Sequence, residues 1–145
     1  MSEAIIIRRA RPRDSPAIAR LLRELGYPLA AGVVRRKVAS LLQAASDQVL
    51  VAEQGAEVVG VIGFHLIPLL HRPGNAGRIT VLVVTDKFRS RGIGTRLVEA
   101  AEDWAWSHDC ALIEVTSREQ RDRAHRFYRT CGYAAQDKRF VKRKS

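Results

Sequence analysis

The residues best suited to chemistry form the short segment Arg89-Ser-Arg-Gly-Ile-Gly94, which directly precedes a stretch with helical periodicity. The first amides of a helix have no partner within the helix, and with the helix dipole they favour an anion such as a pyrophosphate. Glycine lets the backbone approach such a ligand closely, and guanidinium groups suit phosphate oxygens. The segment therefore predicts a phosphate-binding turn formed by Arg89, Ser90, Arg91, Gly92, Ile93, Gly94 and Thr95.

Two common phosphate-binding motifs do not fit this turn. A dinucleotide fingerprint needs a third glycine where Leu97 stands, and a Walker loop needs Gly-Lys followed by Ser or Thr. What remains is Arg-x-x-Gly-x-Gly after an apolar strand. For the turn alone, the competing interpretation is a glycine-rich helix start that binds nothing, because short motifs also occur by chance.

A strand and a helix must position this turn. Residues 79–84 are β-branched and apolar at nearly every position, which is typical of a strand with both faces of its sheet covered. After the turn, a buried helical stripe is predicted from Leu97, Val98, Ala101, Trp104 and Ala105. Further strands are predicted at 4–9, 49–52, 57–66, 111–116 and 133–141, with a loop over 68–77. Further helices are predicted from Ser15 to Leu25, around 34–45 and over 120–131.

Length and composition indicate one globular domain over residues 1–145, with 46% hydrophobic residues. The chain has no apolar run of membrane-spanning length and no secretory signal, so we expect a cytoplasmic protein that does not contact membranes. Its two cysteines, Cys110 and Cys131, lack the spacing of metal ligands, and no metal is expected.

The formal net charge of +10 is the unusual feature of the composition. Such a charge attracts polyanions and anionic substrates. The basic residues are spread along the chain without a nucleic-acid-binding motif, which favours a solvated basic surface. An anionic acceptor and a nucleic-acid partner both stay open, as does a homodimer.

The Arg-x-x-Gly-x-Gly turn resembles the pyrophosphate-binding signature of the GCN5-related N-acetyltransferase (GNAT) family. A second motif, formed by Ala124, Phe127, Tyr128, Gly132 and Tyr133, resembles the closing motif of that family. The two motifs are correctly separated, and the segment Gly63-Phe-His-Leu66 adds a likeness to the branch with aminoalkylphosphonate N-acetyltransferases. The resemblance implies an α/β (α+β) fold: a mixed, mostly antiparallel sheet of six or seven strands, open between the fourth and fifth, flanked by four helices.

The resemblance also implies the chemistry, in which an amine attacks the thioester of acetyl-coenzyme A (acetyl-CoA). The backbone edge at Leu82, Val83 and Val84 would pair with the pantetheine arm, and an N–H near Val83 would stabilise the oxyanion. Tyr128 would act as the general acid that protonates the departing thiolate. The competing interpretation is that Tyr128 is a core residue beside Phe127.

The general base is less evident, because many relatives have a glutamate on the fourth strand where this chain has Arg78 and Thr80. Glu114 shares a strand face with Thr116 and could serve as the base, or it could be a structural partner for an arginine. His65 and His125 are alternative proton relays. Residues expected to contact the acceptor are Tyr27, His65, His71, Arg78 and Thr116.

The function predicted in this way is acetyl transfer to a primary amine of a small molecule, with Arg72, Arg78 and His71 suiting an anionic one. Acetylation of a protein N-terminus, a lysine or aminoacyl-tRNA is an alternative, as is a non-catalytic acetyl-CoA sensor.

Overall fold

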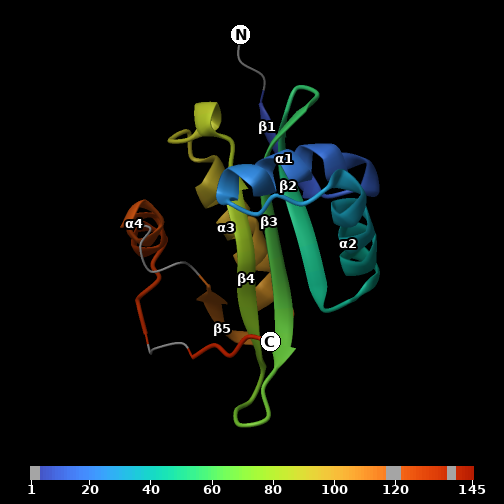
Figure 1. The fold of residues 1–145 in the computed structure, drawn as a ribbon. Helices are drawn as coiled ribbons and strands as arrows, with labels where there is room; N and C mark the ends of the chain where they lie inside the picture. Colours follow the sequence, from blue (N-terminus) through green and yellow to red (C-terminus); the bar gives the residue numbers. More distant parts are fainter. Residues whose placement is uncertain (1–3, 117–121, 137–139) are drawn as a thin grey trace.

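The computed structural model describes residues 4–116, 122–136 and 140–145 of the chain. Two short 3-10 helices, η1 (Pro12–Asp14) and η2 (Asp86–Phe88), accompany five strands and four α-helices (Figure 1). The strands are β1 (Ile5–Arg9), β2 (Asp47–Gln54), β3 (Glu57–Pro68), β4 (Asn75–Val84) and β5 (Cys110–Val115). The α-helices are α1 (Ser15–Leu25), α2 (Ala31–Gln43), α3 (Ile93–Trp106) and α4 (Asp122–Thr130). No helix of these described segments is long and apolar enough to cross a membrane.

The strands form one mixed sheet in the order β1-β2-β3-β4-β5, antiparallel except for the parallel pair β4 and β5. Helices α1 and α2 cover one face and α3 covers the other (Figure 1). Strand β4 contributes to both cores, since Val81 and Val83 pack on the side of α1 and α2 while Leu82 and Val84 pack towards α3. This confirms the prediction of a strand that is covered on both faces.

The sheet opens between β4 and β5. Their pairing runs only from Asn75 to Ile79 on β4, and the Thr116 amide donates to the Ile79 carbonyl at 3.3 Å. Beyond Ile79, the register with β5 ends while β4 continues to Val84. Helix α4 stands apart from the sheet on this side of β4 (Figure 1). Residues 80–84 of β4 are therefore not paired with β5.

Several predicted elements are corrected by the structure. The sheet has five strands rather than six or seven, because residues 133–136 and 140–145 form no strand. Residues 137–139 of the predicted last strand, and 120–121 of the predicted last helix, lie outside the described residues. Ala134, Ala135 and Gln136 interrupt the segment with residues that do not favour strands. The predicted loop over 68–77 is shorter, since β4 already begins at Asn75.

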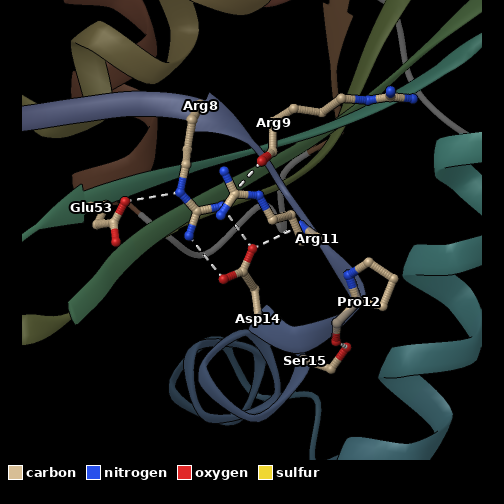
Figure 2. A network of polar contacts seen from close by, with 7 residues as sticks. All are labelled: Arg8, Arg9, Arg11, Pro12, Asp14, Ser15 and Glu53. Carbon is tan, nitrogen blue, oxygen red and sulfur yellow. Dashed lines mark hydrogen bonds and ion pairs between the residues drawn. The ribbon is translucent and has the colours of Figure 1, made fainter. Parts of the chain in front are cut away.

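An ionic network fixes the start of α1 against the sheet (Figure 2). Arg8 on β1 donates to both carboxylate oxygens of Asp14, each at 2.9 Å, and to Glu53 of β2 at 2.9 Å. The Arg11 amide donates to Asp14 at 2.7 Å. The hydrogen bond from Arg8 lowers the pKa of Asp14 although the carboxylate is buried. The network joins β1, β2, η1 and the first turn of α1.

Candidate functional site

The turn between β4 and α3 is built on left-handed backbone conformations. Ser90 has a φ of 64° and Gly92, the N-cap residue of α3, has a φ of 78°. A Cβ atom at Gly92 would have no neighbour within 4 Å, so glycine is favoured there by its backbone conformation rather than by crowding. The left-handed residues turn the chain sharply into α3.

Six successive amides of this turn are available to a ligand. Within the described part of the chain, no hydrogen bond uses the N–H groups of residues 90–95, and the first helical bond runs from the Arg96 amide to the Gly92 carbonyl. Unpaired amides at the start of a 14-residue helix concentrate positive partial charge. The geometry suits the phosphate groups that the sequence predicted for this turn.

The turn is held in place by side chains on both sides. Arg89 donates to the Val84 carbonyl at 3.2 Å and to Asp86 at 3.0 Å, so its guanidinium braces the turn as well as charging it. Glu24, near the end of α1, accepts hydrogen bonds from the Thr85 hydroxyl at 2.7 Å and the Asp86 amide at 3.1 Å. Arg91 lies over the Phe88 ring, 4.9 Å from its centre. Helix α1 therefore helps to position the turn, which the sequence analysis missed.

A cavity of about 730 Å³ lies between this turn and α4. It is lined by all the residues predicted to bind the coenzyme except Arg91. The opposite wall comes from α4, including Arg123, Arg126, Phe127 and Tyr128. Phe127 packs close to Gly94, where a Cβ atom would lie only 3.2 Å from the ring. Glycine at this position therefore lets α4 approach the start of α3.

Tyr128 lines this cavity, and its hydroxyl group forms no hydrogen bond with any described residue. Burial raises the pKa of Tyr128 to about 12, with a smaller contribution from nearby Cys131. Its neighbour Tyr133, whose ring centre is 6.0 Å away, instead donates to Glu102 at 2.8 Å. Tyr128 is thus a neutral phenol with its donor uncommitted among the described residues.

Beyond Ile79, the edge of β4 that faces the gap is paired with no other described strand, although the Val84 carbonyl accepts a hydrogen bond from Arg89. The Thr85 amide donates to the Val59 carbonyl of β3, and Val83 pairs with Val61 of the same strand. Because backbone groups alternate sides along a strand, those of Leu82 and Val84 face the gap. An N–H donor for an oxyanion, predicted near Val83, is therefore better placed at Leu82 or Val84.

A row of polar side chains crosses the sheet on the face covered by α1 and α2. Asp47, His65, Arg78 and Glu114 are successive cross-strand partners on β2, β3, β4 and β5. Arg78 and Glu114 form an ion pair at 2.9 Å, so the charges of these two predicted site residues are paired with each other. His65 lies between Asp47 and Thr80, at 2.8 Å from each. Asp47 and Thr80 were not singled out from the sequence as partners of this histidine.

The remaining predicted acceptor contacts are not gathered in the cavity. Tyr27 follows the end of α1 and is 45% exposed, and it does not line the cavity. His71 and Arg72 lie in the exposed turn 69–74, at the opposite end of β4 from the phosphate turn. Thr116 marks the end of the pairing between β4 and β5. Among residues 4–116, 122–136 and 140–145 there is no cluster of three side chains that could hold a metal ion.

The sequence of this chain is similar to those of known acetyltransferases. The family model for the acetyltransferase (GNAT) family matches residues 17–133. The chain belongs to the GNAT acetyltransferase family. The aminoalkylphosphonate N-acetyltransferase of Salmonella typhimurium is 37% identical over 91 residues, which are 63% of this chain and 59% of that protein. The chain therefore spans less than two thirds of that relative's length.

Solved GNAT-like structures superimpose over nearly the whole chain. An aminoglycoside N-acetyltransferase in complex with CoA has a TM-score of 0.88, covering 99% of this chain and 97% of that one, at 14% identity. A transcriptional regulator from Bacillus halodurans C-125 has a TM-score of 0.87 at 25% identity, covering 97% of this chain and 100% of that one. These likenesses establish the GNAT fold, with a five-stranded mixed sheet and four α-helices.

Proposed function

We propose that this GNAT protein transfers the acetyl group of acetyl-CoA to the primary amine of a small molecule that also carries an anionic group. The observation that carries this proposal is the shared cavity, which is lined both by residues of the turn whose amides are unpaired among the described residues and by Tyr128 of α4. One part suits a diphosphate, and the other suits a departing thiolate.

The residues of the cavity fit the coenzyme as a co-substrate. The amides at the start of α3 would bind its diphosphate, and Arg123 and Arg126 on the opposite wall add positive charge. The gap-facing N–H and carbonyl groups of Leu82 and the N–H of Val84 would pair with the amide groups of the pantetheine arm, since the Val84 carbonyl is bound by Arg89. This binding would place the thioester beside the opening of the sheet, so that proximity supplies much of the rate.

The chemical step uses few side chains. The unprotonated amine attacks the thioester carbonyl, and a C–N bond forms as the C–S bond breaks. An N–H of Leu82 or Val84 stabilises the negative charge on the carbonyl oxygen. Tyr128 gives its proton to the departing thiolate, and the proton that the nitrogen sheds on becoming an amide restores the phenol. Burial raises the pKa of Tyr128 to about 12, so its hydroxyl stays protonated and can donate a hydrogen bond to the developing thiolate.

Two observations support an anionic acceptor. The chain has a formal net charge of +10, which attracts anionic ligands. The Salmonella relative is named for its action on aminoalkylphosphonates. Because Arg78 is paired with Glu114, the attraction of an anionic acceptor is ascribed to the net positive charge of the whole protein rather than to this arginine.

The test is release of free thiol from acetyl-CoA with aminoethylphosphonate and with ethanolamine, which carries a hydroxyl group in place of the phosphonate. We expect kcat/KM to be at least about tenfold higher for the phosphonate, which corresponds to about 1.4 kcal/mol. Equal or better use of ethanolamine would refute the anionic preference. Absence of thiol release with either amine and with a wider amine panel would refute the transferase itself.

A further inference from the structure

We propose that Asp47, His65 and Thr80 form a proton relay that removes the extra proton from the acceptor ammonium group. The inference rests on the proposed acetyl transfer, because only an unprotonated amine can attack the thioester. It would supply the general base that the proposed reaction needs.

The three side chains are connected by short hydrogen bonds. The Nδ1 atom of His65 lies 2.8 Å from an Asp47 carboxylate oxygen, and its Nε2 atom lies 2.8 Å from the Thr80 hydroxyl. They come from β2, β3 and β4, three adjacent strands of one sheet. An ionised carboxylate only accepts hydrogen bonds, so Nδ1 carries the proton and Nε2 of the neutral ring accepts one from Thr80.

Thr80 lies where the sheet opens. The pairing of β4 with β5 ends at Ile79, and the exposed Thr80 follows directly at an irregularity in the register with β3. Leu82, the first cavity-lining residue of β4, is two residues further on, roughly 7 Å along a strand. The Thr80 hydroxyl is therefore the exposed end of the relay, close to the position proposed for the thioester.

The proton transfer balances within the relay. The ammonium group gives a proton to the Thr80 oxygen while the Thr80 hydroxyl proton moves to Nε2 of His65. The products are a neutral amine, an intact hydroxyl and an imidazolium that faces the Asp47 carboxylate, as in the general-base logic of hydrolytic triads. In this state Nε2–H donates to Thr80, whose hydroxyl can turn to the Gly63 carbonyl at 3.4 Å. Both charge states are thus accommodated before the proton leaves to solvent.

Glu114, the alternative base, is less suited to this role. It accepts two hydrogen bonds from Arg78, at 2.9 and 3.2 Å, so its carboxylate is already held by a guanidinium. The charged neighbours of His65 among the described residues are Asp47 on β2 and Arg78 on β4, and the charge of Arg78 is balanced by Glu114 on β5. The Asp47 carboxylate is therefore the direct charged partner of the ring.

The test compares His65→Gln, Asp47→Asn and Thr80→Val with Thr80→Ser and with Glu57→Gln, which removes an exposed charge from β3. Thiol release with aminoethylphosphonate is followed from about pH 6 to about pH 9.5, a range in which imidazole and simple amines change charge. We expect His65→Gln and Thr80→Val to lower kcat/KM about 100-fold near pH 7. The loss should shrink as the pH rises, because the amine then arrives unprotonated. Asp47→Asn should act in the same direction, while Thr80→Ser and Glu57→Gln should resemble wild type.

Equal losses at every pH would show that the three side chains have only a structural role, and would overturn the relay. Wild-type pH profiles in all three variants would do the same while leaving the transferase intact. No turnover by wild type would instead overturn the proposed function, and the relay with it. An independent readout is the ¹⁵N spectrum of His65, which should show a neutral ring with its proton on Nδ1; a proton on Nε2 would contradict the relay.

Discussion

Tyr128 and Tyr133 lie close together, but the structure gives them different tasks. Tyr133 donates a hydrogen bond to Glu102. The pKa of Tyr133 is raised mainly by burial and, to a smaller extent, by this hydrogen bond. Tyr128 lines the cavity and has no such partner among the described residues. A hydroxyl in this state can donate to a group that forms only during the reaction, which is the arrangement that lowers a transition-state barrier.

Replacing Tyr128 by Phe should therefore lower kcat about 100-fold with little change in the KM for acetyl-CoA. Tyr133→Phe is the matched control, and it should cost about 1 kcal/mol of unfolding free energy while leaving kcat nearly unchanged. Steady-state thiol release and thermal unfolding measure the two effects. A Tyr128→Phe enzyme with full kcat would mean that the thiolate is protonated from elsewhere.

At the scale of elements, α1 is attached to the sheet at both ends. Its start is held by the Arg8, Asp14 and Glu53 network, and near its end Glu24 binds the residues that follow β4. The same helix therefore contacts both the ionic network and the residues that follow β4.

Asp14→Asn should lower the unfolding free energy by about 2 kcal/mol at neutral pH, because it leaves Arg8 without its main anionic partner. The folded pKa of Asp14 lies below the unfolded value of 3.8, so its contribution is present above pH 3.8 and is lost as the pH falls through the folded pKa. Denaturant unfolding of wild type should thus show a stability loss below about pH 4 that is smaller in the variant. Asp103→Asn, at an exposed position on α3, is the control. An equal acid response in wild type and Asp14→Asn would contradict this account.

For the whole molecule, the sequence patterns located the phosphate turn and the tyrosine because both depend on local signals. The two glycines, the helix start and the strand before them are read within about 30 residues of chain. Cross-strand partners were harder to predict. Counting outwards from the Gly55 turn pairs Asp47 with Phe64, but a shift of register between Ala52 and Glu53 pairs it with His65 instead. A one-residue shift decides which side chains share a face.

The pairing of Arg78 with Glu114 depends in the same way on a parallel register between strands joined through α3. The sequence left Glu114 open between a base and an arginine's partner, and it could not name the arginine. The strand predicted over 133–141 does not form in its described residues 133–136 and 140–141, although Tyr133, Phe140 and Val141 are residue types that favour strands. Local motifs thus identified the turn and the tyrosine that the structure brings to one cavity, while they did not predict the cross-strand partners of His65 and Arg78.

The most direct test of the account is a crystal structure of this protein bound to coenzyme A. The account predicts that the diphosphate accepts hydrogen bonds from amides of residues 90–95 and that the sulfur atom lies within hydrogen-bonding distance of the Tyr128 hydroxyl. A coenzyme bound elsewhere with this turn empty, or a sulfur atom remote from Tyr128, would contradict it.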